Sequence, residues 1–543
     1  MTDPSVCFVV NGRPIRLGDA DALTSLSTLL RRRLGLIGTK VVCAEGDCGA
    51  CTVLIGRPVE NADGTARLDY RPIDACIVQA FQCRGTHVVT VEGLQGPTSA
   101  EPQAEPDPAR LTVLQKAMVD GHGSQCGFCT PGIVMALHGL HEQTGAPQPL
   151  DHDRVRHGLS GNLCRCTGYQ QIFDACAAVD PAKIARLAEV YDEAVILSML
   201  EEQPGGAFTM TLSVPIGPGD RADQTPAQVD PASNGHPAPL QQSAAWLDGP
   251  ALPSRKVELF LPTTLAEALR YKHDHPEALV VAGATDVGVW QSHGAAWPDR
   301  VLSITGLEEL AGCHAEPDGF RLGAGATWRA VLDCVADGLP QWAGILERFG
   351  SPQIREMGTL GGNLANGSPI ADSLPALFGM DAQVELGSHE RGARRVPITE
   401  FYTGYKQTGM TPSELILAVH LPHLAENERL HLEKSSRRLD MDISTFTAAV
   451  RVGLSPDGTS IETAAVALGG VGPTVVRLPE VEALLCGRAF DEAAFRQAGA
   501  LARSLIRPIS DVRGAAEHRL RLAENVFLKA WHGWQTSRTM ENV

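Results

Sequence analysis

The sequence predicts an α+β fold that is divided among several domains. Its 543 residues are enough for three or four domains of about 150 residues each. Short apolar runs typical of strands, such as residues 6–10 and 461–468, are interspersed with helical repeats such as residues 23–34 and 491–505. Two groups of closely spaced cysteines lie in glycine-containing loops near the N-terminus. We therefore expect small metal-binding domains followed by larger α+β domains.

The composition excludes several classes of function. The formal net charge is −17 and no long basic stripe is present, which argues against nucleic acid or a membrane surface as a partner. Apolar residues make up 43% of the chain but never run to the ~18 that a transmembrane helix needs. No basic stretch followed by an apolar core opens the chain, so we expect no secretory signal. Fourteen cysteines then indicate a reducing compartment, the cytoplasm, where they serve as metal ligands or core residues.

The first cysteine group has the spacing Cys-x4-Cys-x2-Cys, and one more cysteine follows further on. This is the ligand pattern of a plant-type [2Fe–2S] cluster. Gly46 and Gly49 permit the unusual φ values of a loop that wraps its thiolates inward, and they leave amide groups to point at the sulfurs. A zinc loop and ordinary buried cysteines are the alternatives. The predicted cluster ligands are Cys43, Cys48, Cys51 and Cys76.

Residues 1–100 are expected to form a ferredoxin-like β-grasp domain around this loop. The Asn-Gly dipeptide at residues 11–12, between two apolar runs, is a strong hairpin signal. A helix is predicted over residues 23–34, just before the cysteine loop. Cys7 and Cys83 lie outside the ligand spacing, and we expect both to be buried core residues. Further strand candidates are residues 52–55, 67–70 and 87–92.

Residues 101–202 are expected to form a helical domain with the second cysteine group at its helix ends. Thr130 and Pro131 have the residue types of an N-cap and a first helical position. Cys-x2-Cys and Cys-x-Cys give four thiolates on two loops, which close one metal site if the loops face each other. Zinc is the rival, but a neighbouring [2Fe–2S] loop favours a second cluster in an electron chain. The helices are predicted at residues 111–119, 130–143, 153–159 and from near Thr167, and the ligands are Cys126, Cys129, Cys164 and Cys166.

These motifs together resemble those of the molybdenum hydroxylases, the family of xanthine dehydrogenase and aldehyde oxidoreductase. The resemblance is carried by the first cysteine loop, by Cys-Gly-Phe-Cys-Thr-Pro-Gly at residues 126–132 and by Asn-Leu-Cys-Arg-Cys-Thr-Gly-Tyr at residues 162–169. It implies that the N-terminal cluster lies nearer a flavin and the second cluster nearer a molybdopterin. It also implies that Gln125 contacts the pterin, with simple loop hydrogen bonding as the alternative.

Residues 203–252 are rich in proline and glycine and predict an extended linker, with one short strand at residues 209–214. After it, residues 253–430 carry two stretches that suit a cofactor. The Ala-Gly-Ala-Thr-Asp-Val turn at residues 282–287 follows a strand and lets backbone amides approach a pyrophosphate, although it is not G-x-G-x-x-G. Taken alone, this motif favours the alternative, an ordinary tight turn. The run of small and amide residues at 358–372 suits a loop around a cofactor.

Both stretches resemble the FAD-binding module of the same family, an α+β fold unlike the Rossmann fold. For Asp372, capping of the following helix is the alternative, and for Phe349 it is core packing. Tyr405 and Lys406 resemble a segment near the nicotinamide entry. The resemblance assigns to FAD binding Ala282, Gly283, Ala284, Thr285, Asp286, Val287, Phe349, Gly362, Asn363, Ser368 and Asp372.

Residues 431–543 are expected to form the C-terminal α+β domain of the flavoprotein. Lys434 and Asp440 lie in a run that resembles the loop passing the flavin, with Lys434 as a nearby cation. A solvated charge cluster is the alternative for this run. Strands are predicted at residues 445–452 and 461–468, and helices at residues 491–505 and 514–531.

The resemblance implies the iron–sulfur/FAD electron-transfer subunit of a xanthine dehydrogenase-type oxidoreductase of purine catabolism, with no catalytic residue on this chain. Electrons would pass from molybdopterin on a partner chain through both [2Fe–2S] clusters to FAD and on to NAD. The chain ends where single-polypeptide members continue into a molybdopterin domain, so we expect a large-subunit partner in a heterodimer or a dimer of heterodimers. The alternatives are the same subunit of an aldehyde or other N-heterocycle dehydrogenase, a stand-alone NADH-dependent iron–sulfur flavoprotein reductase, and a redox sensor or cluster carrier.

Overall fold

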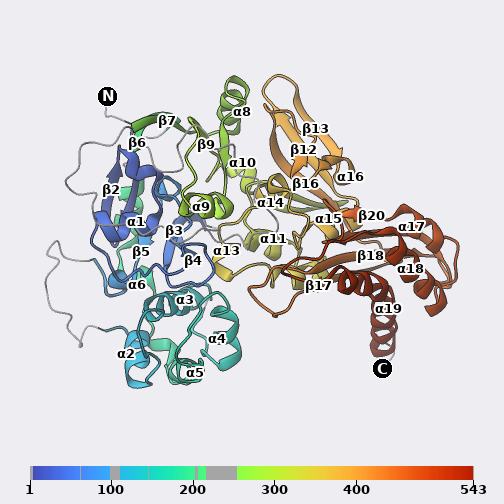
Figure 1. Ribbon diagram of the computed structural model, residues 1–543. Helices are drawn as coiled ribbons and strands as arrows, with labels where there is room; N and C mark the ends of the chain where they lie inside the picture. The colour runs from blue at the N-terminus through green and yellow to red at the C-terminus, as the bar shows by residue number, and fades with distance from the viewer. Residues whose placement is uncertain are drawn as a thin grey trace. The chain divides into compact units, whose positions relative to one another are not determined.

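The computed structural model describes residues 4–61, 63–97, 111–144, 146–201, 206–215 and 254–541, with its elements labelled in Figure 1. The chain forms two compact units. Unit 1 comprises Met1–Thr263, Glu277–Thr305 and Pro352–Met357, and unit 2 comprises Thr264–Pro276, Gly306–Ser351 and Gly358–Val543. Most of the predicted linker at residues 203–252 lies outside the described residues. Among the described ranges, no helix combines the length and apolar character that a membrane span requires.

A mixed five-stranded sheet begins unit 1, with the strand order β2-β1-β5-β3-β4. The predicted Asn-Gly turn joins β1 and β2, and both of its residues have positive φ. β5 is parallel to β1, and the other neighbouring strands are antiparallel. Cys7 and Cys83 are buried in the core, as expected. The strands are β1 (Val6–Val10), β2 (Arg13–Leu17), β3 (Thr52–Glu60), β4 (Ala66–Asp74) and β5 (His87–Val89).

The prediction of one continuous helix at residues 23–34 is wrong, because the structure divides this stretch into separate short turns. Ser25 accepts a hydrogen bond from the Thr28 amide and starts a new turn, which then widens into a π-helical turn. The strand predicted at residues 87–92 likewise ends early and continues as a 3₁₀ turn. The short helical elements are η1 (Ala20–Leu23), α1 (Leu26–Thr28), η2 (Leu29–Arg33), η3 (Ala80–Cys83) and η4 (Val91–Gln95).

The helical part of unit 1 packs α3 against strands β3 and β4. Helix α3 has Cys129 as its N-cap, so the predicted Thr130 cap is wrong by one residue. The Thr130 hydroxyl instead donates to Ser124 Oγ at 2.9 Å. The fourth helix begins at Gln170 rather than near Thr167. The helices are α2 (Val113–Asp120), α3 (Thr130–Glu142), α4 (His152–Gly158), α5 (Gln170–Ala177), η6 (Pro181–Lys183), α6 (Leu187–Val190) and α7 (Glu193–Glu201).

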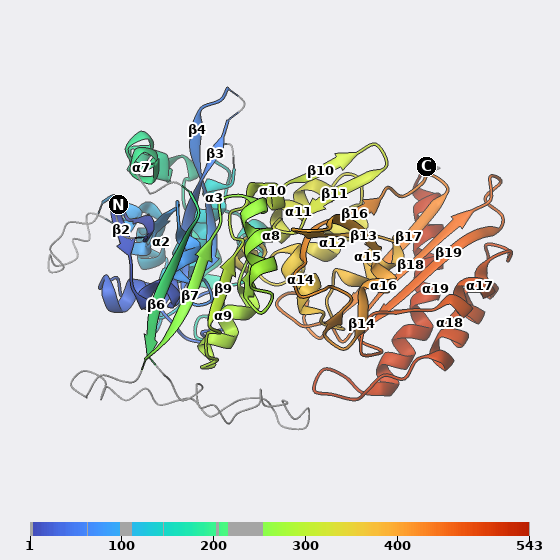
Figure 2. The same ribbon diagram turned by 90° about the horizontal axis from the view of Figure 1, so that it is seen from above.

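A second sheet completes unit 1, with the order β6-β7-β9-β8; Figure 2 shows β6, β7 and β9 side by side. Its β6 confirms the short strand predicted near residue 209. Helix α9 follows β8 and packs closely against the segment after Cys76. The contact is so close that a methyl group added to Gly288 would come within 2.1 Å of the Ile77 carbonyl oxygen. The elements are β6 (Phe208–Pro215), β7 (Ser254–Leu261), β8 (Leu279–Val281), α9 (Thr285–Ser292), β9 (Arg300–Ser303) and α13 (Pro352–Arg355).

Unit 2 contains a five-stranded sheet with the order β10-β11-β16-β12-β13 and a small β14-β15 pair. Around this sheet a core forms from apolar residues of strands and helices, including Trp328 and Trp342. The elements are α8 (Leu265–Asp274), α10 (Glu308–Ala311), β10 (Cys313–Glu316), β11 (Gly319–Gly323), α11 (Trp328–Val335), α12 (Pro340–Leu346), α14 (Leu360–Asn366), α15 (Leu374–Gly379), β12 (Gln383–Ser388), β13 (Gly392–Pro397), α16 (Ile398–Phe401), β14 (Tyr402–Gly404), β15 (Gln407–Thr408) and β16 (Leu415–Pro422).

The C-terminal part of unit 2 is an antiparallel sheet, β17-β18-β19-β20, which contacts helices on both faces. Ala449 faces the core that contains α15, and its neighbours Ala448 and Val450 face the core of the C-terminal helices, as the two-residue period of a strand requires. The elements are β17 (Glu428–Ser435), β18 (Phe446–Leu454), β19 (Ile461–Gly469), β20 (Val476–Arg477), α17 (Pro479–Leu485), α18 (Glu492–Leu505) and α19 (Ala516–Glu541). The predicted strands and helices of this part are thus present.

Two helical glycines provide a test of the α9 packing. Alanine is favoured over glycine inside a helix by about 1 kcal/mol. Gly344→Ala in α12 meets nothing within 4 Å and should keep or raise the thermal unfolding midpoint. Gly288→Ala should lower it, because overpacking costs about 1–3 kcal/mol. Equal midpoints for the two variants, measured by scanning calorimetry, would contradict this packing.

Candidate metal and flavin sites

The first cysteine loop wraps as its glycines predict. Gly46 and Gly49 have φ of 76° and 63°, and Ala44 also lies in the left-handed region. The loop lies between η2 and β3, and the fourth cysteine, Cys76, lies two residues after the end of β4. The thiol of Cys43 hydrogen bonds to those of Cys48 and Cys76, and the thiol of Cys76 also contacts that of Cys51. The four predicted ligands of the N-terminal cluster therefore form one connected group of thiols.

These four thiols cannot all ionise by themselves. Hydrogen bonds from its neighbours hold the pKa of Cys43 far below the usual range. The same contacts, together with burial, raise the pKa values of Cys48 and Cys76 far above it. The full set of thiolates is stable only if a cation offsets their charge. This chemistry fits a metal centre better than ordinary buried cysteines.

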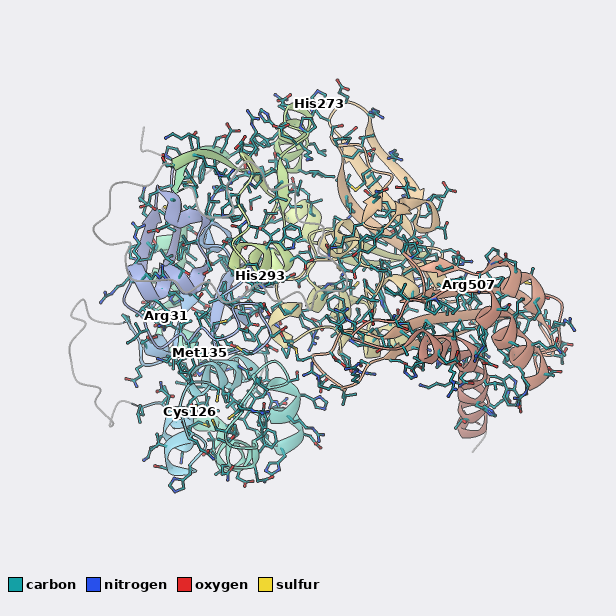
Figure 3. The ribbon with its side chains drawn as sticks, in the orientation of Figure 1. Arg31, Cys126, Met135, His273, His293 and Arg507 are labelled. Carbon is teal, nitrogen blue, oxygen red and sulfur yellow. The ribbon has the colours of Figure 1, made fainter. Side chains whose placement is uncertain are left out.

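The second cysteine group forms two pairs across two loops. The Sγ atoms of Cys126 and Cys166 are 3.6 Å apart, and the thiol of Cys129 hydrogen bonds to that of Cys164. Each pair joins one cysteine from the loop before α3 to one from the loop before α5. Cys126 is labelled in Figure 3, in the helical part of unit 1. The two loops therefore face each other, as predicted.

A tyrosine that the sequence reasoning missed braces the second loop. The Cys164 amide donates to Tyr169 Oη at 2.8 Å, and that hydroxyl donates to the Asn162 carbonyl oxygen at 3.3 Å. Tyr169 itself has φ of 71° and forms the N-cap of α5, so the loop closes tightly on its own helix. The signal in the sequence was the tyrosine that ends the motif at residues 162–169, three residues after Cys166.

Pairs of thiols suit a cluster of two metal ions. Two thiols per ion are what a [2Fe–2S] cluster with four thiolate ligands requires. A mononuclear zinc site would require all four thiols to converge on one point.

The predicted phosphate loop, residues 282–287, lies in unit 1. Ala284 has φ of 59° and forms the N-cap of α9, with no side-chain cap on that helix. Gln82 Nε2 and Thr305 Oγ1 both donate to the Ala282 carbonyl oxygen, at 2.9 and 2.6 Å. A helix N-terminus after a turn of small residues fits an anionic diphosphate. Sequence reasoning had no signal for the roles of Gln82 and Thr305.

The second predicted flavin stretch, residues 358–372, lies in unit 2. Thr359 caps α14 by accepting from the Gly362 amide at 3.1 Å. Asn363 Oδ1 accepts from Ser373 Oγ at 2.6 Å, which ties the start of α14 to the start of α15. A methyl group on Gly361 would come within 2.7 Å of Ala324, so the small residues here permit close packing.

Asp372 does not cap the helix after it, so that alternative is wrong. Helix α15 has Ser373 as its N-cap and no side-chain cap. The Asp372 carboxylate instead accepts from Lys434 Nζ at 2.5 Å and from Ser444 Oγ. Lys434 also donates to the Arg348 carbonyl oxygen at 2.8 Å and is only 6% exposed. The solvated-cluster alternative is therefore wrong for Lys434.

The remaining predicted residues lie nearer the surface. Phe349 is partly buried and packs against Trp328, with the two rings tilted by 38° and their centroids 4.6 Å apart. Asp440 is partly exposed, and Tyr405 is 58% exposed. Gln125 is exposed, and none of the described residues hydrogen bonds to its side chain. A loop hydrogen-bonding role for Gln125 is thus without support within the described chain.

Comparisons with known proteins match this organisation. Four family models cover most of the chain: a 2Fe-2S iron-sulfur cluster binding domain at residues 8–80, a [2Fe-2S] binding domain at 90–177, the FAD binding domain in molybdopterin dehydrogenase at 255–424, and the CO dehydrogenase flavoprotein C-terminal domain at 431–533.

Xanthine dehydrogenase of Drosophila pseudoobscura pseudoobscura is 31% identical, and the match covers 96% of this chain and 39% of that protein. Aldehyde oxidase 1 of Macaca fascicularis is 30% identical over 89% of this chain and 36% of that protein. The chain thus spans about two fifths of the length of these relatives. A solved structure, reconstituted CO dehydrogenase from Oligotropha carboxidovorans, is 31% identical; it covers 50% of this chain and 94% of that chain, with a TM-score of 0.45.

The fold, the two cysteine sets and the flavin-binding match define an iron–sulfur flavoprotein. The chain belongs to the molybdenum hydroxylase family, of which it carries two [2Fe–2S] domains and the FAD-binding module. The predicted family and fold class are confirmed. Three of the predicted cofactors, the two [2Fe–2S] clusters and FAD, are confirmed as well.

Anaerobically purified protein should contain about four irons and four labile sulfides per chain, two of each per cluster. Cys129→Ala should reduce both contents to about half. Cys176→Ala, in the same helical domain but outside both sets, should leave both contents intact; so should loss of Cys7, Cys83, Cys313, Cys334 or Cys486. Stoichiometric zinc without visible absorbance would contradict the two-cluster assignment.

Proposed function

We propose that this chain is the electron-transfer subunit of a xanthine dehydrogenase-type molybdenum hydroxylase. Electrons pass from a partner-bound molybdopterin through both [2Fe–2S] clusters to FAD and on to NAD. The observation that carries the proposal is the direct contact between the two cysteine loops, where the Leu163 amide donates to the Cys48 carbonyl oxygen at 2.9 Å. Two one-electron centres held this close suit electron exchange.

The cofactors divide the redox chemistry between them. The clusters carry one electron each, NAD accepts two together, and FAD links the two regimes. Oxidation of the substrate belongs to the partner, so this chain supplies no residue to that step. Its own side chains hold the centres and keep the spacing between them. The proposed cluster ligands are Cys43, Cys48, Cys51 and Cys76 for the N-terminal cluster, and Cys126, Cys129, Cys164 and Cys166 for the second.

For FAD, we assign the diphosphate to the N-terminus of α9, where the helix dipole and amides favour an anion. The buried Lys434–Asp372 pair supports a role for both residues in holding the loops around the flavin. Phe349 and Asp440 are assigned on the family resemblance. The full proposed set is Ala282, Gly283, Ala284, Thr285, Asp286, Val287, Phe349, Gly362, Asn363, Ser368, Asp372, Lys434 and Asp440.

The domain bounds remain our proposal, and the family matches support it. We assign residues 1–100 to the ferredoxin-like domain, 101–202 to the helical domain and 203–252 to a linker. Residues 253–430 form the FAD-binding domain and residues 431–543 the C-terminal flavoprotein domain.

A molybdopterin-binding large subunit is the proposed partner, in a heterodimer or a dimer of heterodimers in the cytoplasm. Its docking surface is centred on the second cysteine set. Cys126 and Cys166 are exposed, and beside them Phe128 and Leu163 are 47% and 60% exposed. Exposed apolar side chains gathered around a redox centre are typical of an interaction surface. Gln125 lies on the same loop and is available to a pterin.

The surface continues onto the first cysteine loop. Ile37 and Val42 are 60% and 62% exposed on that loop. Lys40, between them, lies 6.0 Å from the centre of the Phe128 ring and so connects the two loops. Because relatives with this domain set include both xanthine dehydrogenase and aldehyde oxidase, we propose xanthine as the substrate, with an aldehyde or another N-heterocycle as the alternative.

Cys166→Ser tests the order of the centres. In the complex with its partner, the variant should lose substrate-driven NAD reduction, because electrons must leave the partner through the second cluster. It should keep NADH-driven reduction of an artificial dye, which needs only the flavin end. Equal loss of both activities in a folded, FAD-replete variant would contradict the proposed order.

Leu163→Asp tests the docking surface. A carboxylate in an apolar interface should weaken partner binding by about tenfold or more, since an unpaired buried charge costs more than ~1.4 kcal/mol. The matched control is Val195→Asp, which introduces the same charge at a site on α7 that is 46% exposed. Both variants should retain four irons. Equal affinity of the two variants for the large subunit, measured by calorimetry, would exclude this face as the interface.

A further inference from the structure

A buried polar junction lies between the two cysteine loops in unit 1. It is formed by Thr52, Asn162 and Gln353, which are 2%, 3% and 1% exposed. The three residues come from distant parts of the sequence: the start of β3, the loop before α5, and α13. Buried amide groups are costly unless they are hydrogen bonded. Both amide groups take part in the junction, although Gln353 Oε1 has no hydrogen-bond partner among the described residues.

Asn162 holds the first loop from the side of the second. Its Nδ2 donates to the Gly49 carbonyl oxygen at 2.9 Å and contacts Thr52 Oγ1 at 3.3 Å. The Thr52 hydroxyl donates to the same Gly49 carbonyl at 2.7 Å. Gln353 completes the junction, because its Nε2 donates to Asn162 Oδ1 at 2.8 Å and to Thr52 Oγ1 at 3.3 Å. Gln353 thereby fixes the orientation of the Asn162 side-chain amide, which donates to the Gly49 carbonyl oxygen.

The backbones around this junction are too close for intervening side chains. A methyl group on Gly132 would come within 2.1 Å of the Gly49 carbonyl oxygen, and one on Gly49 would come within 2.3 Å of the Gly161 carbonyl oxygen. The Leu163 amide can therefore reach the Cys48 carbonyl. Since Leu163 precedes Cys164, covalent bonds and this single hydrogen bond form a continuous path from one ligand set to the other.

We propose that Gln353 is a positioning residue for electron transfer between the two clusters. It contacts neither cysteine set and acts through Asn162 and Thr52, which keep the Leu163–Cys48 hydrogen bond closed. Residue 353 belongs to the stretch matched by the FAD-binding family model, yet it lies in unit 1. The flavin-binding stretch of the sequence thus supplies the side chain that sets the contact between the clusters. This inference rests on the proposed function.

The segment that carries Gln353 is anchored independently of that side chain. Arg71 pairs with Glu356 at 3.7 Å, and Arg57 Nη2 contacts Met357 Sδ at 3.1 Å. A substitution of Gln353 therefore changes the junction while the segment stays in place. The variant Gln353→Met keeps the length of the side chain and removes both amide donor contacts. Cys176→Ala is the control, because it truncates a buried side chain of the helical domain outside the junction.

The first measurement is hydrogen exchange of the Leu163 amide in the iron-loaded protein. In the wild-type chain this amide should exchange slowly, although the Leu163 side chain is 60% exposed. In Gln353→Met the Leu163 amide should exchange at least about tenfold faster. The substitution leaves the buried Asn162 Oδ1 without its donor, so Asn162 no longer holds the two loops together. In Cys176→Ala its exchange should match that of the wild-type chain. A wild-type Leu163 amide that exchanges as fast as unprotected loop amides overturns the proposal, whatever the variants do.

The second measurement follows the clusters themselves. Freeze-quench electron paramagnetic resonance, after mixing with substoichiometric dithionite, reports the redistribution of electrons between them. Gln353→Met should slow this step by about tenfold while retaining four irons and bound FAD, and Cys176→Ala should not slow it. A wild-type rate in Gln353→Met overturns the proposal.

If Gln353→Met loses iron, Thr52→Val replaces it, because that change removes the hydroxyl that Gln353 and Asn162 share. It should give the same faster exchange and slower transfer, and wild-type values for both overturn the proposal. Failure of the proposed function is distinguishable, because Cys166→Ser would then change substrate-driven and NADH-driven activity equally, whereas Gln353→Met would still speed exchange of the Leu163 amide and slow transfer between the clusters.

Discussion

The close approach of the two cysteine loops is the constraint on which unit 1 depends. One loop belongs to a β-sheet domain and the other to a helical domain, and the two have no local sequence relationship. They meet because α3 packs on β3 and β4 and because glycine at positions 49 and 132 leaves room for backbone-to-backbone contact. Amide groups then replace apolar packing at the contact. An apolar interface would allow small sliding movements, whereas directional hydrogen bonds fix one geometry.

This geometry has a consequence for the redox centres. Their spacing is set by backbone atoms of the ligand loops themselves rather than by long side chains with many rotamers. The same close packing recurs where Gly288 of α9 meets the Ile77 carbonyl, next to Cys76. The candidate phosphate loop at the start of α9 is thus braced against the segment that carries a cluster ligand. Within unit 1, one set of tight contacts positions both ligand sets and this loop.

Unit 2 depends on a buried ion pair of a different kind. Lys434 lies in a strand and is buried, whereas Asp372 lies in a loop and its side chain is 10% exposed; the two form an ion pair. Burial of such a pair gives little net stability, because desolvation offsets the attraction. Removal of either partner is nevertheless costly, since it leaves a charge unpaired. The pair therefore fixes the β17 end and the Asp372 loop relative to each other, and Ser444 extends the link to the following strand.

The sequence by itself determined the cysteine sets, the N-terminal hairpin and most strands and helices. Ligands such as Cys126 and Cys129 are joined by short segments, so their spacing encodes their chemistry. The same holds for the Asn-Gly turn, whose backbone preference is local. The tertiary structure decided which thiols pair, as in Cys126 with Cys166, and it excluded the alternative that Asp372 caps the following helix. It also placed Gln353 between the cluster loops. Such contacts join residues that are remote in sequence, and no local preference specifies them until the chain has folded.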